Sequence, residues 1–286
     1  VVMRRLFRTS IIFYIISIFL VAQDKPKSIL PGPDRAEGEG PFKRLVIRGA
    51  IVIDGSGAPP RGPVDIVIEG NKITSVSGVG YPGVPINEKR RPKPGDYEID
   101  AHGAYVMPGF VDMHTHAGDP QKAPDTEYVY KLWLAHGVTT VRGVGLGSLE
   151  FSLSEKNRSA KNEITAPRIW AYQRPGQGKD WKGGSINDPA TARKWGKYAA
   201  KKGVDGLKLG SYEPRIMAAL IDEATKNNLG TTAHLAQTGV ARMNTIDAAR
   251  LGLGTQTHYY GLFESMYENN DIQPWPVDMN YRDRKS

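Results

Sequence analysis

The chain has 286 residues, 40% of them hydrophobic and 24% charged, and its formal charge at pH 7 is +8. This composition is typical of a folded, soluble protein with one large domain and a small one, and the mild positive charge is weak evidence for an anionic partner. The absence of cysteine excludes disulfides, thiolate metal sites and cysteine nucleophiles, so any metal must be bound by His, Asp, Glu or Lys.

The N-terminus has the layout of a signal peptide, which we place at residues 1–22. A basic stretch at 4–8 precedes an apolar run at 11–22, and the chain turns polar from Gln23. The apolar run is shorter than the roughly 20 residues that a membrane-spanning helix needs. We therefore expect cleavage after Ala22, a periplasmic or secreted protein, and no stable membrane span after cleavage. An uncleaved anchor is the alternative.

Residues 23–42 are rich in Pro, Gly and charge without an apolar period, which predicts a flexible linker. A small β-sandwich domain is expected over residues 43–107. Its strands are predicted at 45–53, 64–68, 73–76 and within 97–107. A basic run at 89–93 lies in a proline-rich loop with no aromatic platform, so we expect a solvated loop and no nucleic-acid binding.

Residues 108–286 are predicted to form an α/β domain, because strands now alternate with amphipathic helices. The predicted strands are 110–116, 138–144, 168–172, 204–209, 231–236 and 255–260. The predicted helices are 126–136, 189–202, 214–228 and 240–251. Glycines after the expected helix ends, at 137, 203, 230 and 252, support these boundaries. The alternation favours a parallel sheet curled into a TIM-like (β/α) barrel.

The stretch PGFVDMHTH at 108–116 is the predicted first strand of this barrel, with Phe110 and Val111 in its buried apolar body. Side chains alternate faces along a strand, so His114 and His116 point to the same side and can bind one metal ion. Taken alone, the pair is equally well explained by two solvated histidines.

Lys208 lies between Leu207 and Leu209 in a later strand and faces the other side from them. A lysine buried there is costly unless it is paired or chemically altered. Burial favours the neutral amine, which can take up carbon dioxide to become a carbamate between two cations. A structural lysine that reaches solvent is the alternative.

His234 and His258 fall late in the next two predicted strands, each about 25 residues further on, which is one βα unit. Four of the six histidines thus lie at strand C-termini, the face where barrel enzymes hold their chemistry. Together with the buried lysine they predict a metal site.

With these residues in order, the chain resembles the amidohydrolase superfamily of metal-dependent hydrolases. GVDGLKLG at 203–210 and TAHLAQ at 232–237 resemble its imidazolonepropionase- and prolidase-related branch. GVTTVR at 137–142 also matches, although Gly143 follows where such proteins often carry Asp. The resemblance covers residues 43–260 and implies a distorted barrel beside a small β-sandwich.

The resemblance also implies the site and the reaction. His114 and His116 would hold one divalent metal, His234 and His258 the second, with carbamylated Lys208 between them. A metal-activated hydroxide would then attack the carbonyl of a C–N bond in a small amide, cyclic amide or dipeptide-like substrate. Zinc is the expected ion, since imidazole and carbamate oxygen suit it, and a phosphotriester or lactone substrate is the alternative within this class.

The expected substrate-binding residues are Tyr212, Tyr260 and Trp181, the last in a glycine-rich loop at 173–187 that resembles a mobile lid. The family also uses an aspartate on the eighth strand as base and ligand, and we assign no residue to this catalytic role. Candidates near the end of the chain lack a buried strand around them; they are Asp271, Asp278 and Asp283.

Residues 110–286 are too few for a complete barrel of roughly 250 residues, so we expect a C-terminally truncated barrel that lacks its last strands. The alternative function is therefore a truncated, catalytically inactive family member that binds only metal or a partner. An open, apolar sheet edge is also expected to make the chain poorly soluble or a homo-oligomer.

Overall fold

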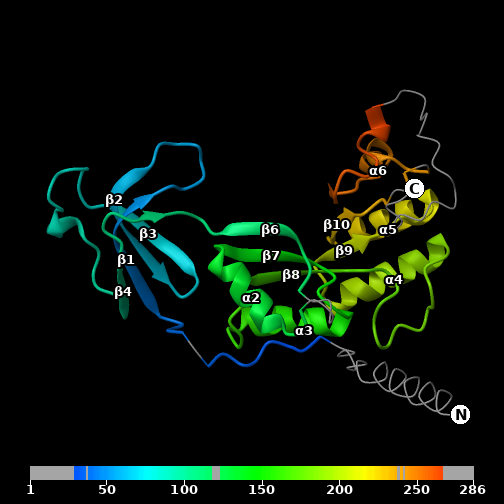
Figure 1. The fold of residues 1–286 in the computed structure, drawn as a ribbon, viewed down its shortest axis with the longest axis horizontal. Helices are drawn as coiled ribbons and strands as arrows, with labels where there is room; N and C mark the ends of the chain where they lie inside the picture. Colours follow the sequence, from blue (N-terminus) through cyan, green and yellow to red (C-terminus); the bar gives the residue numbers. More distant parts are fainter. Residues whose placement is uncertain (1–28, 37, 118–122, 237–238, 241, 267–286) are drawn as a thin grey trace, which may run out of the picture.

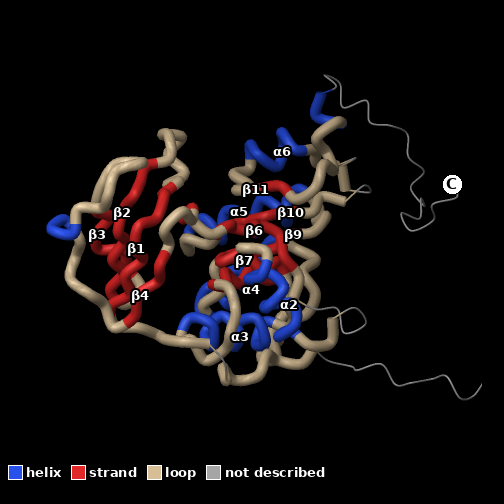
Figure 2. The backbone as a smooth tube through the Cα atoms, turned by 60° about the vertical axis from the view of Figure 1, so that its left-hand side comes forward, coloured by secondary structure: helices blue, strands red, loops and turns tan. Residues whose placement is uncertain are grey.

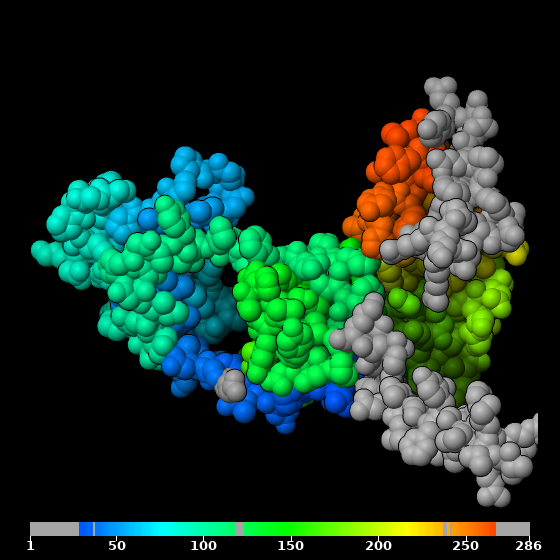
Figure 3. All heavy atoms as spheres, in the orientation of Figure 1, coloured from blue at the N-terminus to red at the C-terminus, as the bar shows by residue number. Residues whose placement is uncertain are grey.

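The computed structural model describes residues 29–36, 38–117, 123–236, 239–240 and 242–266. The predicted signal peptide at 1–22 and the candidate aspartates after residue 266 lie outside these ranges. Figure 3 shows two lobes, and Figure 1 shows that the N-terminal lobe is a sheet and that helices cover a second sheet in the larger lobe. None of the described helices combines the length and the apolar character that crossing a bilayer requires.

The smaller lobe is one five-stranded sheet in the order β3-β2-β1-β4, with β5 paired to β1. Its strands are β1 Arg44–Val52, β2 Arg61–Glu69, β3 Lys72–Gly78, β4 Tyr97–Asp100 and β5 Tyr105–Val106. The first three are antiparallel, whereas β4 and β5 run parallel to β1. Ala50, Val64 and Ile66 are buried in its core. A sandwich requires two sheets, and the described part of this lobe contains a single sheet, so the predicted sandwich is not confirmed.

The larger lobe is a six-stranded parallel sheet in the order β11-β10-β9-β8-β7-β6 (Figure 2). The strands are β6 Phe110–Thr115, β7 Val138–Val144, β8 Arg168–Gln173, β9 Gly206–Leu209, β10 Gly230–Ala233 and β11 Thr255–Gln256. The helices are α2 Thr126–Ala135, α3 Leu149–Ala160, α4 Pro189–Lys202, α5 Pro214–Lys226 and α6 Thr245–Arg250. Each strand lies beside its neighbour in sequence, as in a barrel, and within the described residues no ladder joins β11 to β6. The α/β prediction is confirmed, and the described residues form a curled, parallel half-barrel sheet that is consistent with the predicted incomplete TIM-like barrel.

The outer face of the sheet packs on α4 and α5. Leu207 and Leu209 of β9 are fully buried in one cluster with Trp195 of α4 and Leu220 of α5. Because side chains alternate along a strand, this packing turns Lys208 to the inner face.

Helix α3 is absent from the sequence-based prediction. Ser148 caps it by accepting a hydrogen bond from the backbone N–H of Phe151. Its buried positions are mainly polar, with Ser152, Glu155 and Ser159 inside. The helix therefore lacks the apolar stripe by which an amphipathic helix is recognised in a sequence.

Three predicted elements are shorter in the structure. Strand β10 ends at Ala233, β11 ends at Gln256, and α6 begins only at Thr245. His234 and His258 consequently lie in the loops that directly follow their strands, and His258 adopts a positive φ of 63°. Loop positions leave both imidazoles at the C-terminal end of the sheet.

The residue that ends α5 also differs from the prediction, which placed Gly230 after the end of this helix. Asn228 takes the positive φ, 54°, whereas Gly230 is already the first residue of β10. A Cβ at Gly230 would collide with the hydroxyl of Tyr172. This glycine therefore serves close packing between strands rather than the end of a helix.

The predicted burial of β6 is wrong at its first residues. Phe110 is 60% exposed and Val111 is 55% exposed. The reason is that β6 is an edge strand, which pairs with β7 alone among the described strands. Its apolar side chains are therefore left without the cover that a closed barrel would give.

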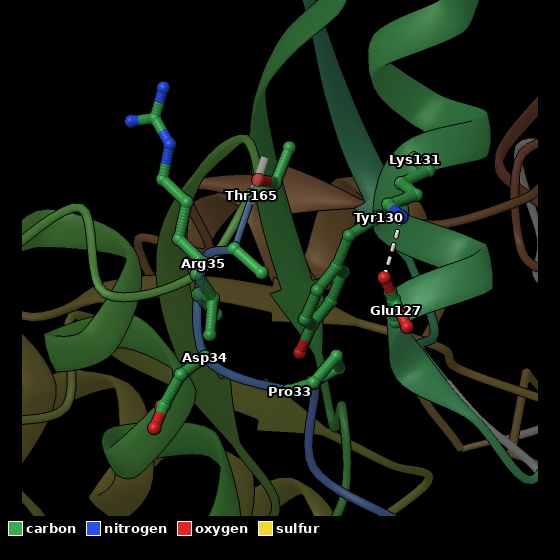
Figure 4. Close-up of a pocket in the computed structure, with 10 residues that line it drawn as sticks. Pro33, Asp34, Arg35, Glu127, Tyr130, Lys131 and Thr165 are labelled. Atoms are coloured by element: carbon green, nitrogen blue, oxygen red, sulfur yellow. Dashed lines mark ion pairs between the residues drawn. The ribbon is translucent and has the colours of Figure 1, made fainter. Parts of the chain in front are cut away.

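Part of the predicted linker is docked on the larger lobe. In the segment 29–36, Leu30 forms a β-bridge with the residue that precedes α2. The N–H of Gly32 donates to the buried carboxylate of Glu155 (3.2 Å), which also accepts from the hydroxyl of Tyr130 (3.0 Å). Figure 4 shows the pocket that this segment forms with α2; its volume is about 100 Å³, and neither Lys208 nor any of the four histidines predicted as metal ligands is among the residues that line it.

Candidate functional site

The four predicted histidines form a row at the C-terminal ends of β6, β10 and β11. Neighbouring ring centroids lie 5.1 Å apart from His116 to His114, 5.1 Å from His114 to His258, and 4.9 Å from His258 to His234. The curl of the sheet thus brings side chains of its first and last described strands into contact.

Burial keeps three of these imidazoles neutral at pH 7. It lowers the pKa of His114 to about 3, and the charge of Lys208 adds to the effect. Burial is likewise the main cause of the lowered pKa of His116 and of His234. A neutral imidazole keeps a lone pair for a metal ion, and Nδ1 of His114 is buried without a hydrogen-bond partner among the described residues.

Lys208 faces the same interior and is only 5% exposed. Its Nζ donates to Oγ1 of Thr257 (3.2 Å), and no described carboxylate forms an ion pair with it. Burial, followed by the charges of Arg174 and Arg142, lowers the pKa of its amine to about 8. At neutral pH a larger fraction of this amine is therefore uncharged than in an exposed lysine. The uncharged amine is the form that reacts with carbon dioxide.

Arg142 on β7 crosses the interior of the sheet, and the sequence did not identify it as a site residue. Its Nε donates to the carbonyl of Met113 on β6 (2.6 Å), and its Nη1 donates to Oγ1 of Thr255 on β11 (2.9 Å). A longer contact of 3.4 Å joins Nη2 to Oγ1 of Thr232, which lies 3.0 Å from Oγ1 of Thr257. Arg142 therefore ties β6 to β11 and orders the hydroxyls next to the buried lysine.

Gly143 stands where the resemblance leads us to expect an aspartate. A Cβ at this position would collide with the side chain of Leu146, which is fully buried. The position has no room for a carboxylate, so the local packing accounts for the departure from the family pattern.

Two adjoining cavities lie next to this group. One, of about 300 Å³, is lined by Lys208, His234, Tyr212 and Arg174 among others. The other, of about 560 Å³, is lined by residues of the loop at 175–187 and again by Tyr212. Of the four histidines, His234 is among the residues that line the first cavity, and none is among those that line the second.

The structure places all three expected substrate-binding residues near these cavities. Trp181 lines the larger cavity and Tyr212 lines both. Tyr260 stacks on His234, with ring centroids 4.8 Å apart and planes 9° apart. Arg174 was missed because a charged residue in a loop is ordinarily solvated; its position directly after a barrel strand is the signal that marks it.

The donor set fits a pair of divalent cations in its chemistry but does not form a complete site. No group of three or more His, Asp or Glu side chains in the described ranges is arranged to hold a metal ion. The imidazoles instead come as two pairs, one at the C-terminal end of β6, where His116 directly follows the strand, and one from the loops after β10 and β11. Each pair needs a further ligand, and Lys208 is close enough to affect the pKa of His114, His116 and His234.

Comparison with known proteins places these features in a family context, although no family profile matches the chain. The chain is 35% identical over 98 residues to N-acyl-D-aspartate deacylase of Alcaligenes xylosoxydans xylosoxydans, which covers 34% of this chain and 16% of that protein. It is 39% identical over 77 residues to a dihydroorotase of Caldanaerobacter subterraneus subsp. tengcongensis, covering 27% of this chain and 15% of that protein. The matches thus span much less than two thirds of these relatives.

Solved structures agree on the fold. A Xaa-Pro dipeptidase with bound methionine superposes with a TM-score of 0.58 at 19% identity, covering 75% of this chain and 61% of the other. Phenylurea hydrolase B gives a TM-score of 0.56 at 16% identity, with 76% and 59% covered. The sequence matches cover about a third of the chain and support a member of the amidohydrolase superfamily, and the solved structures agree with the fold.

Proposed function

We propose that this chain is the metal-binding part of a hydrolase that cleaves a C–N bond in a small amide, cyclic amide or dipeptide-like substrate. The proposal rests on one observation, the row of four histidines beside the buried Lys208 at the C-terminal ends of parallel strands. The relatives support the reaction class, since they include a deacylase, a dihydroorotase and a dipeptidase, which act on C–N bonds.

In this proposal His114 and His116 would hold one divalent ion, His234 and His258 would hold the second, and Lys208, once carbamylated, would supply oxygen ligands to both. Zinc is the proposed metal, because imidazole and carbamate oxygens suit it and the chain has no thiolate. Two such ions supply the positive charge that acidifies a water molecule and polarises a carbonyl oxygen.

The protein's own groups prepare this chemistry. Thr257 holds the amine of Lys208 in place at 3.2 Å, and the hydroxyl of Thr232 lies 3.0 Å from that of Thr257. In carbamate formation the neutral amine forms an N–C bond to carbon dioxide and releases one proton. The stacked ring of Tyr260 restricts rotation of His234 and closes one side of the site.

A second proposal is that the chain binds a metal or a partner without catalysis. It is favoured by the lining of the cavity beside Lys208, which contains no Asp or Glu to act as a base. The described strands favour it too, since the sheet ends at its sixth strand, β11, whereas the resemblance places the aspartate base on an eighth strand.

Hydrolysis assays separate the two proposals. The purified full chain is supplied with zinc and bicarbonate and tested on N-acyl amino acids, cyclic amides, dipeptides, lactones and phosphotriesters. We expect amide turnover that bicarbonate enhances and that Lys208→Ala abolishes. Lys201→Ala, which changes an exposed lysine of α4, is the matched control and should retain full turnover. Turnover that survives Lys208→Ala contradicts the proposed mechanism, and no turnover on any substrate supports binding alone.

A further inference from the structure

Three basic side chains converge beside the histidine row without an acidic partner. Lys208 is 5% exposed and Arg142 is 7% exposed, and Arg174 lines the cavity next to Lys208. The hydrogen bonds of the first two go to neutral oxygens of threonines and of a backbone carbonyl. No carboxylate in the described part of the chain forms an ion pair with any of the three. Carbamylation would remove the positive charge of Lys208, but both guanidinium groups keep theirs. Uncompensated positive charge in a partly buried site is costly, and a bound anion relieves that cost.

Arg174 is the member of this group best placed to meet a ligand. It directly follows Gln173, the last residue of β8, at the end of the sheet that carries the histidines. No hydrogen bond joins its guanidinium to another described residue, so its N–H donors are available. Its charge contributes to the lowered pKa of both Lys208 and His234, which means that it acts on the interior of the site.

The rest of the cavity lining suits an anion with several acceptor oxygens. Ser211 and Tyr212 contribute hydroxyl groups, and no Asp or Glu is among the lining residues. Burial raises the pKa of Tyr212, so its hydroxyl stays protonated and can donate. A guanidinium matches a carboxylate in particular, because two parallel N–H donors meet two oxygens in one plane.

We propose that Arg174, with Tyr212, binds a free carboxylate of the substrate in the cavity beside Lys208. The substrate class is then an amide whose carboxylate lies close to the scissile bond, as in an N-acyl amino acid or a dipeptide. The substrate class rests on the proposed hydrolase function, but carboxylate binding is measurable without turnover.

Calorimetry on the purified full chain tests the binding step with two inert probes, 3-phenylpropionate and its uncharged counterpart 3-phenylpropan-1-ol. We expect Arg174→Ala to weaken binding of the carboxylate by at least about tenfold, the size of one lost charge-assisted hydrogen bond. Binding of the alcohol should not change. Arg174→Lys should retain part of the affinity, since an ammonium supplies the charge but not the paired donors.

Arg168→Ala is the matched control. Arg168 is the first residue of the same strand, at its opposite end, and is exposed. This variant should bind both probes as the unchanged chain does. Carboxylate binding that is unaffected by Arg174→Ala overturns the inference, and so does an equal loss for both probes, because an equal loss indicates a structural role.

A hydrolysis assay is the second test, and it distinguishes failure of the carboxylate site from failure of the proposed hydrolase function. An active chain should prefer N-acetyl amino acids over the corresponding N-acetyl alkylamines, which lack the carboxylate, and Arg174→Ala should remove this preference through KM. A chain that binds the carboxylate probe through Arg174 but hydrolyses nothing contradicts the proposed function and supports the carboxylate site. A chain that hydrolyses both kinds of substrate equally well, with or without Arg174, overturns the carboxylate site and supports the function.

Discussion

Replacing Arg142 with methionine tests whether this side chain holds the open barrel in its curl. The substitution keeps the length and apolar stem of the side chain but removes donors to β6 and β11 at 2.6 and 2.9 Å. A hydrogen bond from a charged group contributes roughly 1.5–3 kcal/mol, and the weak contact at 3.4 Å adds little. Methionine also avoids the free-energy cost of desolvating a buried guanidinium, and this offsets part of the lost hydrogen-bond energy. We therefore expect the free energy of unfolding to fall by about 3 kcal/mol.

Urea denaturation followed by circular dichroism measures this change. With a slope of about 2 kcal/mol per molar, the expected loss lowers the midpoint by about 1.5 M. The urea midpoint of Arg142→Lys should lie between those of the unchanged chain and Arg142→Met, because an ammonium can reach one of the acceptors. Arg168→Met, on the neighbouring strand and exposed, is the control and should change stability by less than about 0.5 kcal/mol. A loss below about 1 kcal/mol for Arg142→Met would refute the role of Arg142 as a tie between β6 and β11.

Two further predictions follow from the open edge and from the N-terminus. Phe110, Val111 and Met113 are 60%, 55% and 49% exposed on an edge strand, so the 286-residue chain should be oligomeric or poorly soluble in light scattering; a stable monomer with one cooperative unfolding transition contradicts this. Export predicts a mature N-terminus near Gln23 in the periplasm or the medium, and N-terminal sequencing that still reads Arg4 on membrane-bound protein favours the uncleaved anchor instead.

The sequence was informative where local periodicity decides the outcome. The spacing of His114 and His116 follows from the alternation of a strand, and the intervals to Lys208, His234 and His258 follow from the repeat of βα units. Their meeting at one end of the sheet could therefore be predicted. Their assignment as metal ligands remains a proposal.

The features that the sequence did not reveal depend on contacts between distant residues. Arg142 meets its partners 29, 90 and 113 residues away along the chain, and nothing in GVTTVR indicates them. Helix α3 buries Glu155, and the cost of desolvating this carboxylate is offset by hydrogen bonds from Tyr130 and Gly32 and by an ion pair with Arg158. The buried face of α3 is therefore polar, and the sequence lacks the apolar stripe that would have predicted a helix. The exposure of β6 depends on its having β7 as its one partner among the described strands, and local sequence pattern does not reveal that.

The central claim, that the histidine row and Lys208 hold divalent metal, is tested most directly by the metal content of the purified chain. Inductively coupled plasma mass spectrometry after growth with zinc and removal of free metal should find close to two zinc ions per chain. We expect a sharp fall in His114→Ala and in His258→Ala, and no change in His102→Ala, whose exposed imidazole pairs with Asp100 in the smaller lobe. Zinc that stays near stoichiometric in His114→Ala and His258→Ala would contradict the proposed site.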